Sequence, residues 1–319
     1  MEKLLEVKDL KVSFFTDLGE TQAVKDAGFA IEEGDFFGIV GESGSGKSVT
    51  TKSILRLGPS NCKIMGGEIL FQGEDILKKS EAELREIRGG EIAMIFQDSL
   101  SALNPVYTVG NKMVELIRRH TSMTKKEAKA RVLELLTAVG IIDPEKAMRS
   151  YPHELSGGMR QRVMIAMAMS RNPTVLIADE PTTALDVTIQ AQILHLLLEL
   201  QKKNNMSIIL ITHDLGVVAQ TCKRVAVMCG GYVVEEGTVE EIFLNPGHPY
   251  TQALIASMPR VGGTFEQFLE RDLSDGSGNL CPFLNRCKYA DKTCEACLPK
   301  YYESSEGHKI LCHRREEEK

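Results

Sequence analysis

The sequence predicts an α/β protein with a mainly parallel sheet and a smaller C-terminal part. Residues 36–57 follow the order strand, glycine-rich loop and helix, and residues 173–235 follow the order strand, helix and strand. Parallel strands need a long crossover between them, usually a helix, so this order favours parallel pairing. The cysteines indicate the C-terminal part, because five of the eight lie between Cys281 and Cys312.

Composition and charge narrow the class of protein. Of 319 residues, 43% are hydrophobic and 26% are charged, which is typical of a folded globular protein. The net charge of -6 argues against a broad nucleic-acid-binding surface. No stretch approaches the roughly 18 consecutive apolar residues of a membrane span, and the charged start, MEKLLEVKDL, does not resemble a signal peptide. We therefore expect the cytoplasm, where clustered cysteines indicate metal binding before disulfides.

The expected elements follow the hydrophobic periodicity. Residues 1–40 alternate in short runs, which predicts strands, and a helix is expected over 48–57. The stretch 98–170 is mainly helical, with apolar residues at helical spacing within 125–139: Ala128, Val132, Leu135, Leu136 and Val139. Strands are predicted at 175–179 and 207–212. The helix between them has one apolar face, made by Ile189, Ile193, Leu196, Leu197 and Leu200.

Two Pro- and Gly-rich stretches interrupt this pattern. One lies near 245–263, and the run DGSGN at 275–279 forms a second spacer before the cysteines. We therefore predict two domains, residues 1–258 and residues 259–319.

The strongest motif is the run GESGSGKS at 41–48, which matches the phosphate-loop pattern G-x-x-x-x-G-K-[ST] completely. Its glycines let successive N–H groups point at phosphate oxygens, and the following helix adds a favourable dipole. Lys47 would reach the β- and γ-phosphates, and Ser48 would bind Mg²⁺. The alternative, a glycine-rich turn with a chance lysine, is disfavoured by the apolar strand before it. The predicted nucleotide-binding residues here are Gly41, Glu42, Ser43, Gly44, Ser45, Gly46, Lys47, Ser48 and Val49.

Two further motifs fit a nucleotide site. The run VLIADE at 175–180 is an apolar strand that ends in two carboxylates, of which Asp179 would bind Mg²⁺ and Glu180 would act as general base. Such a strand end is often only structural, but the phosphate loop in the same chain favours the functional interpretation. The run LSGGM at 155–159 predicts an N-cap at Ser156, with Gly157 and Gly158 exposing the first N–H groups of a helix. A capped surface helix is the alternative.

In their order and spacing, these three motifs resemble the nucleotide-binding subunit of an ABC transporter. Gln97 matches the Q-loop, where it would also bind Mg²⁺, and residues 184–186 match the D-loop. His213 matches the switch histidine, although a histidine at a strand end is often just a satisfied polar residue. Phe14 or Phe15 would stack on adenine, and we take Phe14. The resemblance implies an ATPase with a RecA-like core, an antiparallel β subdomain and a helical subdomain.

In that family two such subunits pair head to tail. Each ATP is then held by the phosphate loop of one subunit and the signature serine of the other, so Lys47 and Ser156 would serve different ATP molecules. Longer runs, including SYPHELSGGMRQRVMIAMA at 150–168 and HPYTQALIASMPR at 248–260, resemble the dipeptide and oligopeptide importers. The resemblance implies a homologous second ATPase in a heterodimer, two membrane permease subunits that dock in a groove near Gln97, and an indirect link to an extracytoplasmic solute-binding protein. It places the chain at the cytoplasmic face of the cell membrane, without nucleic acid.

Other functions remain open at this point. Relatives of this subfamily also move nickel or oligosaccharides, and a redox-sensing soluble ATPase would use the cysteines. Repair ATPases of the superfamily insert a long coiled coil before the signature motif, but no sustained heptads occur between Ser48 and Leu155. Translation-type members carry two cassettes, whereas this chain has one.

The cysteine segment has the spacing Cys281-x5-Cys287-x6-Cys294-x17-Cys312. Four thiolates can bind a [4Fe–4S] cluster or a zinc ion. Zinc sites usually contain C-x₂₋₄-C pairs, and the one such spacing here, Cys294-x2-Cys297, involves a fifth cysteine. The resemblance favours a structural [4Fe–4S] cluster on Cys281, Cys287, Cys294 and Cys312, with disulfides as the alternative.

Overall fold

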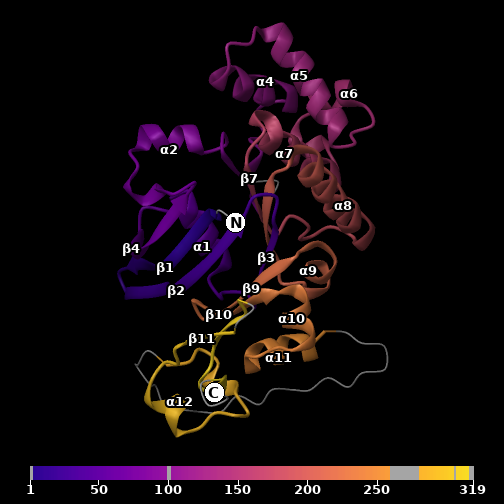
Figure 1. The fold of residues 1–319 in the computed structure, drawn as a ribbon. Coiled ribbons are helices and arrows are strands. Elements are labelled where there is room, and N and C mark those ends of the chain that lie inside the picture. The colour runs from indigo at the N-terminus through magenta and orange to yellow at the C-terminus, as the bar shows by residue number, and fades with distance from the viewer. Residues whose placement is uncertain (1–2, 99–101, 259–279, 305–306, 316–319) are drawn as a thin grey trace. The chain divides into compact units, whose positions relative to one another are not determined.

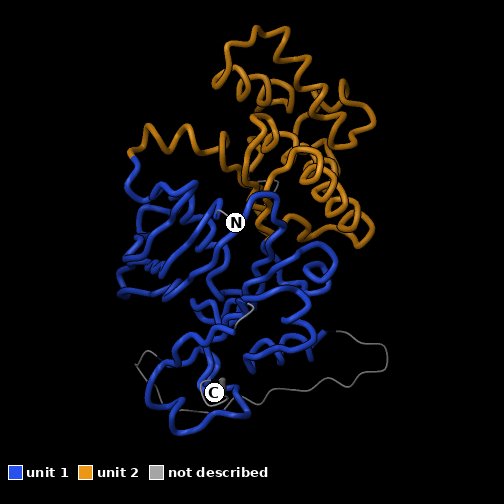
Figure 2. Tube along the Cα trace, viewed as in Figure 1, with its two compact units in different colours: residues 1–79, 211–319 blue, residues 80–210 orange. Residues whose placement is uncertain are grey.

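The computed structural model describes residues 3–98, 102–258, 280–304 and 307–315. The chain forms two compact units (Figure 2). Unit 1 contains residues 1–79 and 211–319, and unit 2 contains residues 80–210. The spacer predicted at 275–279 lies outside the described residues, so the boundary expected at 258–259 stays a prediction.

One half of unit 1 is antiparallel. The strands β1 (Lys3–Thr16) and β2 (Gly19–Glu32) form a long hairpin, and β4 (Cys62–Phe71) pairs with the other edge of β1, followed by the short β5 (Glu74–Asp75). The buried side chains of β1 include Leu5, Val7, Leu10 and Val12, as expected for strands with one buried face. The predicted strands of residues 1–40 are confirmed.

The other half of unit 1 positions the phosphate loop. The fully buried strand β3 (Phe36–Val40) pairs in parallel with β9 (Arg224–Cys229), and β9 pairs antiparallel with β10 (Tyr232–Thr238). Three helices of this unit are α9 (Leu215–Thr221), α10 (Val239–Leu244) and α11 (Pro249–Ala256). The parallel β3–β9 pair and the helices confirm the α/β prediction for this unit.

The helix after β3 is shorter than predicted. The sequence pattern extends it to residue 57, but α1 covers Lys47–Ile54. Arg56 takes the left-handed conformation (φ 49°), and the N–H of Leu57 bonds back to the carbonyl of Lys52 at 2.9 Å. This hydrogen bond closes a Schellman C-cap, which ends the helix.

The C-terminal segment attaches to unit 1 by strand pairing. It contains α12 (Lys292–Ala296), β11 (Tyr301–Glu303) and β12 (Lys309–Leu311), with short 3₁₀ turns at Leu284–Arg286 and His313–Arg315. The strand β12 pairs with both β11 and β10, and Figure 1 shows this segment, in yellow, next to β10. His308 also contacts the fully buried Glu235 of β10 at 2.7 Å. The segment therefore shares the core of unit 1.

Unit 2 contains a parallel sheet and a group of helices. The strands β6 (Ile92–Ile95) and β7 (Val175–Asp179) pair in parallel, and β8 (Ser207–Ile211) follows at the unit boundary. The helices of this unit are α2 (Glu81–Ile87), α4 (Val109–His120), α5 (Lys125–Ala138), α6 (Pro144–Arg149), α7 (Gly157–Ala168) and α8 (Val187–Asn204), with 3₁₀ turns at Pro152–Glu154 and Met169–Arg171. Figure 1 shows α4, α5 and α6 grouped together beyond α7.

The helical periodicities are confirmed in unit 2. In α5 the buried residues are Ala128, Val132, Leu135 and Leu136. In α8 the predicted face is buried from Ile193 to Leu200, while Ile189 in the first turn is half-buried. Within the part of the chain that the structure describes, no helix has the length and apolar character needed to cross a membrane.

Candidate functional site

The loop between β3 and α1 has a conformation that requires glycine. Gly41, Gly44 and Gly46 have φ values of 151°, 78° and 104°, in the region that L side chains rarely adopt. A Cβ atom on Gly41 would lie 2.1 Å from the carbonyl oxygen of Met228, and one on Gly46 would lie 2.7 Å from that of Ala23. Gly41 and Gly46 are therefore needed both for the backbone turn and for close packing, whereas Gly44 is needed for the turn alone, because no atom lies within 4 Å of an added Cβ there.

Lys47 lies across this loop. Its Nζ donates hydrogen bonds to the carbonyl oxygens of Gly41 (2.7 Å) and Glu42 (2.8 Å), and the residue is 5% exposed. Because α1 begins at Lys47, the first N–H groups of the helix and its positive dipole end face the same region. Donors, a cation and a glycine turn together fit the phosphates of a nucleotide. The half-buried Ser48 follows in the first turn.

The carboxyl end of β7 carries the predicted base. Asp179 is fully buried as the last residue of the strand, and Glu180 follows with a left-handed backbone (φ 46°). The Oε2 atom of Glu180 accepts hydrogen bonds from Gln97 Nε2 and from Thr183 Oγ1, each at 2.8 Å. Strained backbone at a non-glycine residue costs about 1–3 kcal/mol and is typical of functional sites. This carboxylate is held in one orientation by two donors.

The structure thus brings Gln97 and Glu180 together across 83 residues of sequence. The reason is the parallel pairing of β6 and β7, which places the chain after both strands at the same edge of the sheet. Thr183 was not among the residues predicted from the sequence. Its only signal there is its place in the turn three residues after Glu180.

The signature motif forms the predicted cap. The Oγ of Ser156 accepts a hydrogen bond from the N–H of Met159 (3.3 Å), so Ser156 is the N-cap of α7. A Cβ atom on Gly158 would lie 2.8 Å from Ile189 Cγ2, and one on Gly157 would lie 3.2 Å from Leu185 Cδ2. The two glycines let the start of α7 pack closely against the D-loop and α8.

Two further residues predicted for the ATP site are His213 and Phe14. His213 is exposed two residues after the end of β8, and the next residue, Asp214, caps α9 by accepting hydrogen bonds from two N–H groups. Phe14 and Phe15 are half-buried in β1, where the ammonium of Lys63 lies 5.1 Å from the Phe15 ring centroid. The phosphate loop, Phe14 and His213 belong to unit 1, whereas Gln97, Asp179, Glu180 and Ser156 belong to unit 2.

The four predicted metal ligands share one small cavity of unit 1. Its lining comprises His248, Pro249, Cys281, Leu284, Cys287, Tyr289, Ala290, Cys294, Pro299, Cys312, His313 and Arg314. Burial raises the pKa of the Cys281 thiol to about 12 and also raises the pKa values of Cys294 and Cys312. Cys297 is exposed and does not line this cavity.

In the structure, the side chains that line this cavity are not arranged as a metal-binding site. Among the described residues, no group of three or more His, Cys, Asp or Glu side chains is arranged to hold a metal ion. The [4Fe–4S] cluster is therefore not shown by the structure. A metal would also have to displace protons from the thiols, since metal binding requires thiolates.

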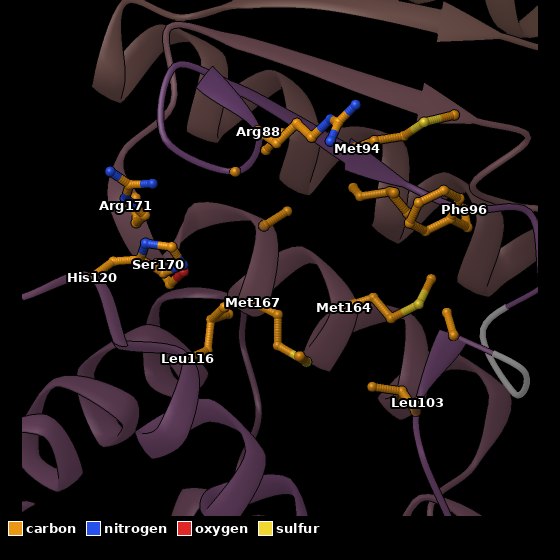
Figure 3. A pocket seen from close by; sticks show the side chains of 15 residues that line it. Arg88, Met94, Phe96, Leu103, Leu116, His120, Met164, Met167, Ser170 and Arg171 are labelled. Carbon is orange, nitrogen blue, oxygen red and sulfur yellow. The ribbon is translucent and has the colours of Figure 1, made fainter. Parts of the chain in front are cut away.

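A second cavity lies in unit 2 and is lined in part by Phe96, the residue before Gln97 (Figure 3). It has about 700 Å³ of empty space, counted with its open mouth, and its lining includes Phe96, Leu103, Leu116 and several methionines. Figure 3 shows Met164 and Met167 of α7 extending into this space, with Arg88, Arg171 and His120 nearby. We call this cavity the methionine groove. The groove that the sequence predicts near Gln97 for permease docking stays a prediction.

Comparison with known families gives matches to two transporter families, and a model of an AAA domain also matches residues 150–219. The family model described as "ABC transporter" matches residues 24–183, and the model "Oligopeptide/dipeptide transporter, C-terminal region" matches residues 234–294. The second match includes three of the four cysteines that line the cavity.

Individual proteins agree with these matches. The dipeptide transport ATP-binding protein DppD of Bacillus subtilis is 49% identical over 319 residues, which cover 98% of this chain and 95% of the relative. The oligopeptide transport ATP-binding protein OppD of the same organism is 56% identical over 268 residues, covering 84% and 75%. A solved dimeric ATP-binding cassette bound to ADP and Pi has a TM-score of 0.66 at 30% identity, covering 74% of this chain and 98% of that one. The predicted fold, an ABC nucleotide-binding domain, is confirmed.

Proposed function

Because the chain belongs to the family of ATP-binding subunits of dipeptide and oligopeptide ABC transporters, we propose that it hydrolyses ATP to drive peptide import through a membrane permease. The observation that carries the ATPase function is the carboxylate of Glu180, held by Gln97 and Thr183 at the end of a buried strand. The names of the relatives support peptides as the solute, ahead of nickel or oligosaccharides.

Nucleotide binding is assigned to the phosphate loop. The N–H groups of residues 41–46 and the first turn of α1, with Lys47, would surround the phosphates, and Val49 would continue this contact surface. Mg²⁺ would be held by Ser48, Gln97 and Asp179, since oxygen atoms are its preferred ligands. Phe14 would stack on the adenine ring.

Hydrolysis is assigned to in-line attack of water on the γ-phosphorus. Glu180 would accept the proton of that water, while Lys47 and the loop N–H groups stabilise the charge on the transferred phosphoryl group. The bond to the β-phosphate oxygen breaks, which leaves ADP and phosphate. His213 would contact the γ-phosphate side of the site as the switch residue. Ser156, Gly157 and Gly158 would contact the ATP that is held by a partner subunit.

The proposed partners are a homologous second ATPase, two permease subunits and, indirectly, an extracytoplasmic solute-binding protein. The methionine groove supports the permease contact, because flexible thioethers adapt to apolar partner surfaces. The chain would then lie at the cytoplasmic face of the membrane.

We also propose that the chain has two domains. Residues 1–258 form the cassette, and residues 259–319 form its C-terminal extension.

The reconstituted transporter tests this function. We expect peptide-loaded binding protein to stimulate ATP hydrolysis severalfold, and the Met167→Glu variant to lose this stimulation because a buried charge would disrupt permease docking. Ile142→Glu is the matched control, since Ile142 is fully exposed outside the groove. Stimulation by nickel or an oligosaccharide in place of peptides would contradict the peptide assignment, and stimulation of Met167→Glu equal to wild type would contradict the docking site.

For the extension we propose a [4Fe–4S] cluster bound by Cys281, Cys287, Cys294 and Cys312. The shared cavity supports this assignment, and so does the position of Cys297 outside it. A cluster is larger than a single ion, so its ligands stand further apart than those of one metal ion. The cluster would crosslink a segment with few buried apolar side chains of its own.

Iron analysis of anaerobically prepared protein tests the cluster. We expect about four irons per chain, and loss of most of the iron in Cys281→Ser. The matched control is Cys297→Ser, which should keep the iron because its thiol lies outside the cavity. One zinc per chain, or iron content that depends on Cys297, would contradict the assignment.

A further inference from the structure

The phosphate loop has contacts with α11 and with the C-terminal segment that its proposed chemistry does not use. The direct hydrogen bonds from Tyr250 and Arg286 involve Glu42, the second residue of the loop. Its backbone N–H donates to the hydroxyl of Tyr250 at 2.9 Å. Its carboxylate accepts two hydrogen bonds from Arg286, from Nη1 to Oε1 at 2.9 Å and from Nη2 to Oε2 at 2.8 Å. This is a paired, bidentate geometry, the strongest form of a guanidinium–carboxylate contact.

Both partners of Glu42 are themselves held in place. Tyr250 is 1% exposed in the first turn of α11, and its N–H bonds to Nδ1 of His248. The ring of Phe283 meets Tyr250 edge-on with centroids 5.4 Å apart, and the guanidinium of Arg286 lies 5.1 Å from the Phe283 centroid. Tyr250, Phe283 and Arg286 therefore form one connected stack that ends on Glu42.

A second connection runs through the turn between β9 and β10. Pro282 lies against Gly230, where an added Cβ atom would come within 2.7 Å of the proline ring. The next residue, Gly231, donates its N–H to the carbonyl oxygen of Ser45 in the loop at 3.0 Å. The C-terminal segment is thus connected to the phosphate loop at two points: directly at Glu42, and at Ser45 through the turn between β9 and β10.

Two properties of the phosphate loop explain why these contacts would matter for nucleotide binding. Three of its residues have positive φ, and glycine-rich backbone loses much conformational freedom when it is ordered. Glu42 also places a negative charge in a loop that would receive phosphates, and like charges repel. The Arg286 guanidinium neutralises that charge, while Tyr250 fixes the backbone of the same residue.

We propose that Arg286 and Tyr250 are positioning residues for nucleotide binding: Tyr250 holds the backbone of Glu42, and with it the phosphate loop, in place, and Arg286 compensates the negative charge of the Glu42 carboxylate. This inference rests on the proposed ATP-binding function. It gives the C-terminal segment a role at the nucleotide site, since Arg286 directly precedes Cys287 and Phe283 lies two residues after Cys281.

The test is a double-mutant cycle on the full chain, with binding of methylanthraniloyl-ATP and Mg²⁺ measured by fluorescence. We expect Arg286→Gln to raise Kd about fivefold, because it leaves the carboxylate of Glu42 uncompensated. In a Glu42→Gln background the same Arg286→Gln change should have no effect, since no charge remains to be neutralised. Tyr250→Phe should raise Kd about threefold, through the lost hydrogen bond to the loop.

Two matched controls accompany the cycle. Lys292→Gln removes an exposed charge from the same segment, and Tyr301→Phe removes a hydroxyl that bonds to Val233 away from the loop. Both should bind the nucleotide as wild type does. If Arg286→Gln weakens binding equally in the wild-type and Glu42→Gln backgrounds, or leaves Kd unchanged, the positioning role is overturned. If the wild-type chain itself does not bind the nucleotide, the proposed function fails instead.

Discussion

Glu180→Gln is expected to bind ATP as tightly as wild type and to hydrolyse it roughly 100- to 10,000-fold more slowly. Glutamine has the same shape as glutamate, and its carbonyl oxygen can still accept the bonds from Gln97 and Thr183. What the variant lacks is a carboxylate that can accept the proton of the attacking water. The groups that hold the phosphates are untouched, so binding should persist.

The measurement is single-turnover hydrolysis together with a nucleotide Kd, in the assembled transporter. The matched control is Glu199→Gln, which changes an exposed glutamate on α8. Its hydrolysis should equal that of the wild type. Retained turnover in Glu180→Gln would remove Glu180 as the general base, and a large rise in Kd would mean that its carboxylate acts in binding.

Lys47→Ala is expected to raise the Kd for ATP about 10- to 100-fold and to stop hydrolysis. Two losses combine in this variant. The positive charge that would face the β- and γ-phosphates is removed, and so are the bonds from Nζ to the carbonyl oxygens of Gly41 and Glu42. The loop therefore loses its cation and one of its internal supports.

Isothermal titration with ATP and Mg²⁺ measures this effect. Lys52→Ala, in the last turn of the same helix, serves as the control for loss of a lysine and should bind normally. Lys47→Arg should not restore binding, because the wider guanidinium differs in shape and reach from the ammonium in a tight loop. Normal affinity in Lys47→Ala would contradict the phosphate-loop assignment.

Much of the fold could be predicted because its causes are local. The strand at 36–40, the strand at 175–179 and the helix at 125–138 follow hydrophobic periodicities that need only neighbouring residues to be read. The N-cap at Ser156 is local in the same sense, since the hydroxyl bonds an N–H three residues later. The end of α1 was missed because a left-handed Arg56, unlike a glycine, leaves no sequence signal.

The sequence predicts the individual residues of the candidate site, but it does not predict the contacts between them. Thr183 beside Glu180 and Arg286 beside Glu42 carry no motif of their own. Arg286 is 244 residues away from Glu42 in the chain, beyond the range of any local pattern. The spacing of the cysteines suggested a common site, and only the folded chain brings the four thiols to one cavity.

By itself, the sequence determined that the backbone can turn at Gly41, Gly44 and Gly46. It also determined which strands are buried and which side chains have the chemistry to bind phosphate or to accept a proton. These properties depend on the residue and its near neighbours. The tertiary structure decided which of these groups meet: Gln97 with Glu180 through parallel pairing of β6 and β7, and the cysteine segment with the phosphate loop through β12 and Arg286. Such contacts follow from the order of strands in a sheet, and strand order is a property of the whole chain.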